Sequence, residues 1–374
     1  MSARAGGSDA ARRLSTWVLL LLGCSALPGG RATTDGAPAP PLTDPTQLCV
    51  GDPSEAAARC RSPREVERWL AGDSLTIVGR RETGGAQGAV ALTLRSPEAT
   101  FDAKWRAASS ASEHNDPLGE LGAHHVQKLI LDPVDYVVPP AASHCFPEAE
   151  YRRWFRSDDD SVEDMECVLG YLSYWLTGSI GLTEARLAGL VPAPRGDAWS
   201  ADAALYDPAR FPHQSGAYRR NVAHLNVIAF LARNGDAHAA QFVSYRRPLH
   251  VFLVDSSVAF SAPQRASMRG RQDLSELVVR AIPADTAERV GELGRDEVMA
   301  LMRIAEHRRA DLGWERVAPG PLLADGRGRL RREGDRVQVG LSRDDARGVL
   351  ERLRILQEAL RSGAIGTFDR GRRP

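Results

Sequence analysis

The chain has 374 residues, and its 48 Lys and Arg balance its 48 Asp and Glu, so its formal net charge is zero. A protein that binds the phosphate backbone of nucleic acid needs a clear basic surplus, and this balance argues against that class of partner. Hydrophobic residues make up 43% and charged residues 26% of the chain, which is the composition of a folded protein. Of the basic residues 46 are Arg, and only Lys104 and Lys128 are Lys. So strong a bias towards Arg directs attention to these two positions.

Residues 1–24 are predicted to be an export signal. A start rich in Arg is followed by an apolar run over 17–22. This run is well short of the roughly 20 residues that a membrane-spanning helix needs, which favours a cleaved signal. It ends in Leu-Leu-Gly-Cys24, which resembles a bacterial lipobox and would make the protein a cell-envelope lipoprotein anchored in the membrane through acylated Cys24. The alternative is a simple secretory signal cut between Ala26 and Ala32, which would give a secreted protein.

The segment 25–48 is predicted to be a disordered tether, because it is rich in Pro, Ala, Gly and Thr and has little apolar surface to bury. Without Cys24, an even number of cysteines remains: Cys49, Cys60, Cys145 and Cys167. Four cysteines allow three pairings, of which the simplest is sequential, Cys49–Cys60 and Cys145–Cys167. The even count favours disulfides in an oxidising compartment over four thiols in a reducing cytosol. A zinc site is disfavoured, because the chain has no Cys-x-x-Cys and no Cys/His cluster.

The next part of the chain is predicted to contain a capped helix and three strands. Ser62 and Glu65 form a capping pattern at the start of a helix over 62–70. Strands are expected where β-branched and alternating apolar residues occur, over 75–78, 88–94 and 100–105. A helix over 119–131 follows, and then strands over 135–138 and 167–172.

The second half is predicted to be mainly helical. Apolar residues recur at helical spacing over 221–233, 273–282, 295–313 and 342–363, and one short apolar strand is expected over 249–254. The fold class is therefore expected to be α+β with two lobes, a strand-rich N-lobe over 49–168 and a mainly helical C-lobe over 169–374.

Several separate segments carry residues suited to phosphate transfer. Asp236 and Gln241 stand five positions apart in a predicted loop, and Asp255 follows a predicted strand. This is the spacing of a phosphotransfer pattern in which the first Asp engages the acceptor hydroxyl and the other two groups hold a metal. Lys104 ends the third strand, where its ammonium can reach nucleotide phosphates, and Glu120 on the next helix is placed to pair with it. The planar guanidinium of Arg cannot simply replace the compact ammonium of Lys, which explains why a chain so rich in Arg would keep Lys at position 104.

A glycine turn joins the first two predicted strands. Gly84, Gly85 and Gly88 would let backbone amides approach phosphates. Taken alone, the turn is equally typical of a hairpin loop, and Gly235-Asp236 is also an ordinary turn pair. The order of all these residues along the chain carries more weight than any one of them.

That order resembles the protein-kinase-like fold in its atypical branches. The segment Gly-Asp-Ala-His-Ala-Ala-Gln over 235–241 is similar to Gly-Asp-x-His-x-x-Asn of aminoglycoside-type phosphotransferases and to Gly-Asp-Arg-His-x-x-Asn of phosphoinositide kinases. The helix from Glu120 that leads into Val-Val-Pro-Pro at 137–140 is similar to the same region of secretory-pathway casein kinases and their bacterial relatives. The likeness covers about residues 74–305.

The resemblance implies ATP and Mg²⁺ or Mn²⁺ as cofactors, and a hydroxyl of a protein or small molecule as phosphate acceptor. It implies that Lys104 holds the α- and β-phosphates, that Glu120 orients Lys104, and that Asp236 acts as catalytic base. Asp255 and Gln241 would then bind the metal.

The chain departs from the family pattern at four places. Gln241 stands where the family has Asn, and Ser256 and Ser257 follow Asp255 where classical kinases have Phe-Gly. The glycine turn lacks the full classical pattern, and Asn234 stands where many relatives have His. Two hypotheses follow: an exported kinase-like phosphotransferase, or a lipid-anchored pseudokinase that acts as a binding or scaffold module. A structural envelope lipoprotein with no nucleotide site is the third.

Overall fold

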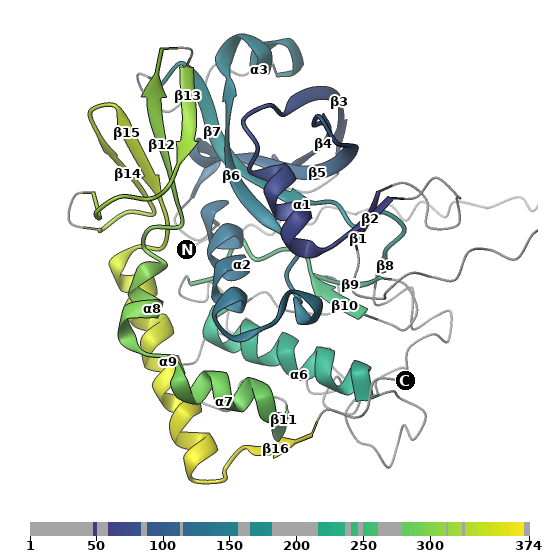
Figure 1. The fold of residues 1–374 in the computed structure, drawn as a ribbon, viewed down its shortest axis with the longest axis vertical. Helices are drawn as coiled ribbons and strands as arrows, with labels where there is room; N and C mark the ends of the chain where they lie inside the picture. Colours follow the sequence, from purple (N-terminus) through teal and green to yellow (C-terminus); the bar gives the residue numbers. More distant parts are fainter. Residues whose placement is uncertain are drawn as a thin grey trace, which may run out of the picture. The chain divides into compact units, whose positions relative to one another are not determined.

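The computed structural model describes residues 48–50, 59–83, 88–112, 115–155, 165–181, 216–235, 241–245, 250–260, 279–311, 313–323 and 326–369. This part of the chain has an α+β fold, as the sequence predicts (Figure 1). Within it, no helix is long and apolar enough to cross a membrane.

The first half of the described chain builds a five-stranded sheet in the order β3-β4-β5-β7-β6, and all neighbouring strands are antiparallel. Its strands are β3 (Thr76–Glu82), β4 (Val90–Arg95), β5 (Thr100–Ala107), β6 (Ala141–Pro147) and β7 (Cys167–Tyr174). A two-stranded ladder precedes the sheet, formed by β1 (Leu48–Val50) and β2 (Arg59–Arg61). The strands predicted over 75–78, 88–94, 100–105 and 167–172 are thus confirmed, with ends that differ by a few residues.

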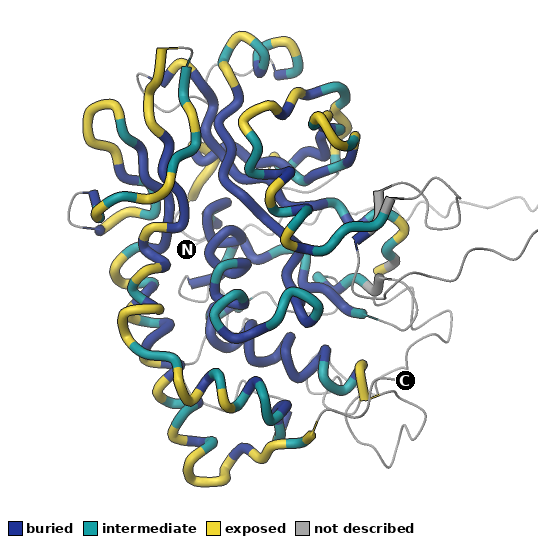
Figure 2. The backbone as a smooth tube through the Cα atoms, in the orientation of Figure 1, coloured by how far each residue is buried: buried dark blue, intermediate teal, exposed yellow. Residues whose placement is uncertain are grey.

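Three helices belong to this half: α1 (Pro63–Leu70), α2 (Leu118–Ile130) and α3 (Glu148–Trp154). The predicted capping box of α1 is confirmed, since the Glu65 amide donates to Ser62 Oγ at 3.3 Å and the Ser62 amide donates to Glu65 Oε2 at 2.9 Å. Helix α2 lies between the sheet and the helices of the second half, and it is mostly buried (Figure 2).

The described residues of the second half form four helices and several short strands. The helices are α6 (Gly216–Leu231), α7 (Ala284–Glu292), α8 (Arg295–Ala300) and α9 (Arg343–Arg361). The strands β8 (Ile180–Gly181), β9 (Phe242–Tyr245) and β10 (His250–Leu253) form a small antiparallel sheet, and β11 (Ala281–Pro283) pairs in parallel with β16 (Gly366–Phe368). The predicted helices over 221–233 and 342–363 and the strand over 249–254 are confirmed. The helix predicted over 273–282 falls mostly outside the described residues.

A second sheet appears where the sequence predicts a helix. The helix expected over 295–313 stops at the end of α8, and the chain continues as β12 (Ala305–Ala310) and β13 (Gly313–Val317). With β14 (Leu330–Glu333) and β15 (Arg336–Val339) these strands form a four-stranded antiparallel sheet in the order β13-β12-β15-β14. The helical prediction for this segment was wrong because pairing with β15, some 30 residues away, decides its conformation.

The strand predicted over 135–138 was also wrong. This segment is a 3₁₀ turn over Pro133–Asp135 followed by chain outside any strand. The side chain of Gln127 in α2 accepts from the amides of Val137 and Val138 and donates to the Val138 carbonyl, at 2.8–2.9 Å. These backbone groups are therefore satisfied by a side chain and not by a neighbouring strand.

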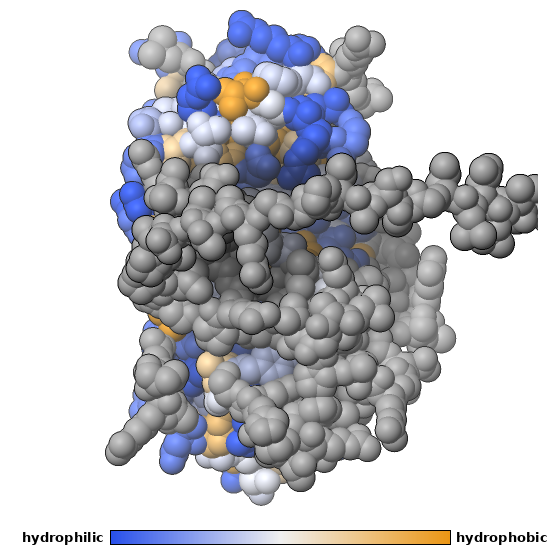
Figure 3. Space-filling view, turned by 90° about the vertical axis from the view of Figure 1, so that its right-hand side faces the viewer, coloured by the Kyte–Doolittle hydropathy of each residue, from blue (hydrophilic) through white to orange (hydrophobic). Residues whose placement is uncertain are grey.

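Three clusters of buried side chains hold the fold. One lies between the five-stranded sheet, α1 and α3, and a second joins α2 to α6, α7, α8 and α9. The third packs the four-stranded sheet against β6, β7 and the start of α2. Figure 2 shows β6, β7, α2 and α6 as the most continuously buried elements, whereas α9 and the β14–β15 hairpin carry exposed residues. On the face turned to the viewer in Figure 3, the described surface over the five-stranded sheet is mostly hydrophilic, and Arg80, Arg81 and Glu82 of β3 are exposed.

The predicted disulfide Cys145–Cys167 is confirmed; it joins β6 to β7, with 5.5 Å between the two Cα atoms. Cys60 is also in a disulfide. In the β1–β2 ladder the backbone of Cys60 pairs with that of Cys49, whose side chain lies outside the described part.

Candidate functional site

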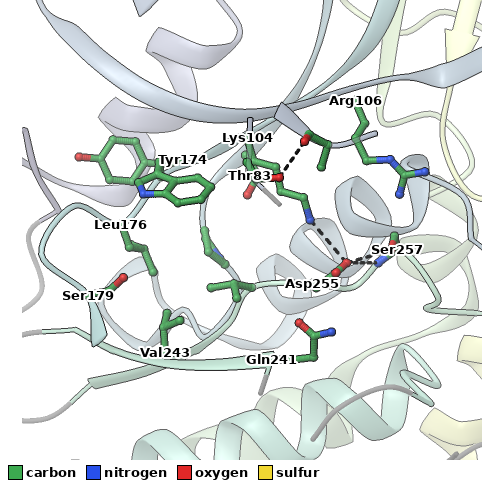
Figure 4. Close-up of a pocket in the computed structure, with 15 residues that line it drawn as sticks. Thr83, Lys104, Arg106, Tyr174, Leu176, Ser179, Gln241, Val243, Asp255 and Ser257 are labelled. Atoms are coloured by element: carbon green, nitrogen blue, oxygen red, sulfur yellow. Dashed lines mark hydrogen bonds and ion pairs between the residues drawn. The ribbon is translucent and has the colours of Figure 1, made fainter. Parts of the chain in front are cut away.

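A cavity of ≈ 320 Å³ opens between the five-stranded sheet and the β9–β10 hairpin (Figure 4). One end is lined mainly by apolar and aromatic side chains: Pro139, Tyr174, Trp175, Leu176, Val243 and Val254. The other end is polar and charged, and is lined by Lys104, Arg106, Gln241, Asp255 and Ser257. A pocket with an apolar end and a few converging polar groups is the usual form of a small-molecule site.

Lys104 and Glu120 form a short ion pair at the polar end. Lys104 Nζ lies 2.5 Å from Glu120 Oε1, and the two side chains are 15% and 4% exposed. Lys104 is in β5, where it pairs with Ser173 of β7, and Glu120 is in the first turn of α2. The pairing that the sequence predicts between these two residues is present.

Asp255 reaches the same ammonium from the other side of the cavity. Asp255 Oδ1 lies 3.5 Å from Lys104 Nζ and accepts a hydrogen bond from Ser257 Oγ at 2.8 Å (Figure 4). Gln241 immediately precedes β9, and Asp255 follows β10 by two residues. The Val254 amide donates to the Gln241 carbonyl at 3.0 Å, which brings positions 241 and 255 together although 14 residues separate them.

Burial and charge shift the protonation of all three groups. Burial raises the pKa of Glu120 to about 7, and the Lys104 ammonium opposes this shift only in part. Burial acts to lower the pKa of Lys104, but the carboxylates of Glu120 and Asp255 outweigh it and hold the pKa above its ordinary value. Burial also acts to raise the pKa of Asp255, yet Lys104 and the hydrogen bonds from Ser257 hold it below its usual range. Asp255 is thus ionised at neutral pH, whereas Glu120 titrates near neutrality.

The segment that carries Asp255 is packed directly on α2. A Cβ atom at Gly119 would lie 3.1 Å from the Ser256 carbonyl oxygen, a tight contact that glycine avoids and that another residue could make only if this carbonyl moved by a few tenths of an ångström. The Asp116 amide, just before α2, donates to the Ser257 carbonyl at 2.9 Å. Arg329 adds a second link, because its guanidinium lies 3.1 Å from Asp116 Oδ2 and donates to the Ala259 carbonyl at 3.3 Å. These contacts fix Glu120 and Asp255 relative to each other.

The donor set at the polar end fits a hard divalent cation that arrives with a phosphorylated ligand. Mg²⁺ is usually held by one or two carboxylates together with substrate phosphates and water. Asp255 supplies an ionised carboxylate with a side chain that is 37% exposed, and Gln241 supplies an amide in the same cavity. Among the described residues no group of three or more His, Cys, Asp or Glu side chains could hold a metal ion without such a ligand.

Some predicted site residues lie outside the described residues, namely Gly84, Gly85, Asp236 and Cys24. Gly88 is described; it has φ +70° and an exposed position at the end of the loop that joins β3 to β4. A positive φ is readily adopted by glycine and rarely by other residues.

The sequence reasoning missed Arg106, which lines the cavity beside Lys104. The two residues are two positions apart in β5 and therefore share one face of the sheet, a periodicity that the sequence already contains. It also treated Ser257 only as a departure from a family pattern, whereas its hydroxyl donates to Asp255. Comparison of the chain with protein-family models and with curated proteins gave no match.

Proposed function

We propose that this protein is a kinase-like phosphotransferase that binds ATP and a divalent cation in the cavity between the five-stranded sheet and the β9–β10 hairpin. The proposal rests on one observation: the carboxylate oxygens of Glu120 and Asp255 lie 2.5 and 3.5 Å from the ammonium nitrogen of Lys104. Protein kinases need such a Lys–Glu pair and a metal-binding Asp in place for phosphate transfer.

The order of elements supports the same proposal. Lys104 stands on the third strand of an antiparallel sheet, Glu120 on the helix that follows it, and Asp255 just after a later hairpin. In protein kinases the lysine of the third strand pairs with a glutamate of the next helix, and an aspartate further along the chain binds Mg²⁺. On this proposal the β3–β7 sheet belongs to the N-lobe of a two-lobed fold, and the four-stranded sheet over 305–339 is an addition to its C-lobe.

The two ends of the cavity suit the two ends of ATP. The apolar end, with Trp175 and Leu176, offers aromatic and aliphatic surface to a purine base. The polar end offers the Lys104 ammonium to the phosphates. Asp255 and Gln241 would hold the cation, whose chemistry is to neutralise the charge of the phosphates. Glu120 keeps Lys104 directed into the cavity, and Asp236 remains predicted as the residue that engages the acceptor hydroxyl.

Thermal unfolding with and without ATP and Mg²⁺ or Mn²⁺ tests nucleotide binding. Saturation at a hundred times the Kd adds about 2.7 kcal/mol to the free energy of unfolding, which a rise in melting temperature reports. We expect the rise in the wild type and its loss in Lys104→Met and Asp255→Asn. Lys128→Met is the matched control, because it changes the other lysine of the chain, which pairs with Glu67 and does not line the cavity. No shift with any nucleotide and metal in the wild type would refute the proposal.

A pseudokinase is the second candidate, and two residues of the site favour it. Gln241 offers its amide on a longer arm than the Asn of the family, and Mg²⁺ tolerates poor geometry badly. Ser257 occupies one oxygen of Asp255 with a hydrogen bond. Incubation with γ-labelled ATP separates the two candidates: transfer of label to the protein itself or to an added acceptor, abolished in Asp236→Asn, supports the enzyme. Binding without transfer supports the pseudokinase.

We further propose that the protein is exported and anchored by a lipid on Cys24. The Cys145–Cys167 disulfide supports an oxidising compartment. Mass spectrometry of the mature N-terminus tests this proposal: an acylated Cys24 supports the anchor, a start between Ala26 and Ala32 supports a secreted form, and an intact Met1 contradicts both.

A further inference from the structure

Arg106 is a buried cation with no counter-ion among the described residues. It is 3% exposed and lines the same cavity as Lys104 and Asp255. Its guanidinium donates to Asn115 Oδ1 at 2.5 Å and to the carbonyl and hydroxyl oxygens of Ser110 at 3.4 Å, all of them neutral groups. Its Nε is buried and has no acceptor within the part of the chain that the structure describes. The described residues thus leave both a positive charge and one of its N–H donors uncompensated at the wall of a cavity.

Two other arginines with little exposed surface are paired with carboxylates. Arg220 is held by Asp135 and Asp285, and Arg329 by Asp116 and Asp345. Arg331 is buried, has no carboxylate partner among the described residues and, like Arg106, leaves its Nε without an acceptor there. It differs from Arg106 because it donates to three backbone carbonyls and does not line the cavity. A buried charge without a partner costs free energy, and an anion that enters the cavity would remove that cost at Arg106.

The position of Arg106 indicates which part of a ligand it meets. In the pairing of β5 with β7, Ala103 lies opposite Tyr174 at the apolar end, Lys104 opposite Ser173, and Arg106 opposite Tyr171. Two residues of a strand span about 7 Å, so the backbone of Arg106 lies about 7 Å further from the apolar end than that of Lys104. Figure 4 shows its guanidinium on the side of Ser257, away from Tyr174 and Leu176.

We propose that Arg106 binds the terminal phosphate of a nucleoside triphosphate and makes the cavity selective for the triphosphate over the diphosphate. This inference rests on the proposed nucleotide site. Lys104 serves the phosphates nearer the base, and the Arg106 fork matches the oxygens of the last phosphate, since guanidinium and phosphate form paired hydrogen bonds.

Isothermal titration with ATP and with ADP, each in EDTA and in Mg²⁺, tests the proposal on the wild type, Arg106→Gln and Arg106→Lys. We expect the wild type to bind ATP at least tenfold more tightly than ADP. Arg106→Gln should bind ADP as the wild type does and lose the preference for ATP, and Arg106→Lys should keep part of it. Arg81→Gln is the control, because this exposed arginine contacts Trp175 at the apolar end and should leave the preference unchanged.

The failures of the two proposals are distinguishable. A wild type that binds neither nucleotide overturns the proposed function and this inference with it. Nucleotide binding with an unchanged ATP-to-ADP ratio in Arg106→Gln overturns only the inference, and so does an equal loss of both affinities. Unfolding without ligand adds a second readout: Arg106→Gln should melt no lower than the wild type because it removes an uncompensated charge, and a large drop would give Arg106 a structural role instead.

Discussion

Replacement of Glu120 by Gln should make the protein more stable at neutral pH than the wild type. Glu120 is 3% exposed, and burial raises its pKa from 4.5 to about 7 despite the short contact with Lys104. A group whose pKa is higher in the folded state holds its proton there between pH 4.5 and 7, so its contribution to stability falls as the pH rises across this window. A pKa shift of one unit on folding corresponds to about 1.4 kcal/mol. The shift of Glu120 from 4.5 to about 7 therefore lowers the free energy of unfolding by about 3 kcal/mol between pH 4 and pH 8. Gln resembles the protonated carboxyl and shows no such loss.

The measurement is urea unfolding of the wild type and Glu120→Gln at several pH values. The difference in the free energy of unfolding, variant minus wild type, should be near zero at pH 4 and rise by about 3 kcal/mol at pH 8. Glu65→Gln is a control of opposite sign, because hydrogen bonds from Ser62 hold the pKa of Glu65 below its ordinary value. The free energy of unfolding of the wild type should therefore rise relative to that of Glu65→Gln as the pH rises. A difference for Glu120→Gln that stays flat or falls with pH would refute the reasoning, since it would mean that the Lys104 pair outweighs the cost of burial.

Two further predictions concern packing and cross-linking. Gly122→Ala in α2 should destabilise the fold by about 1–3 kcal/mol, because the new Cβ would lie 2.5 Å from Leu341 Cδ2 and 2.8 Å from the Phe260 ring. Gly291→Ala in α7 meets no atom within 4 Å and should stabilise by about 0.5–1 kcal/mol; urea unfolding measures both, and equal effects would contradict the packing argument. Removal of the Cys145–Cys167 disulfide, which closes a loop of 22 residues, should cost about 3 kcal/mol. A double Ala variant as stable as the wild type would show that the bond constrains little.

The sequence predicted the local elements best where the signal lies in neighbouring residues. The capping box at Ser62 and the apolar spacing of α2 and α9 are present as expected. It predicted a helix over 295–313 and was wrong there beyond α8, because the partner strand β15 lies far along the chain and no local pattern announces it. The segment at Val137 was mistaken for a strand because its amides donate to a side chain of α2 and not to the backbone of a neighbouring strand.

The candidate site divides in the same way. The sequence by itself determined which chemical groups are available: a rare lysine at 104, a glutamate on the next helix and an aspartate after a later strand. Only the tertiary structure decided that the two carboxylates meet at the Lys104 ammonium and that burial raises the pKa of Glu120 to about 7. It also decided that Arg106 lines the same cavity without a counter-ion among the described residues. The reason is physical, since residue type fixes charge and hydrogen-bonding capacity, whereas distance and burial depend on elements that are remote in the chain and meet only when the core forms.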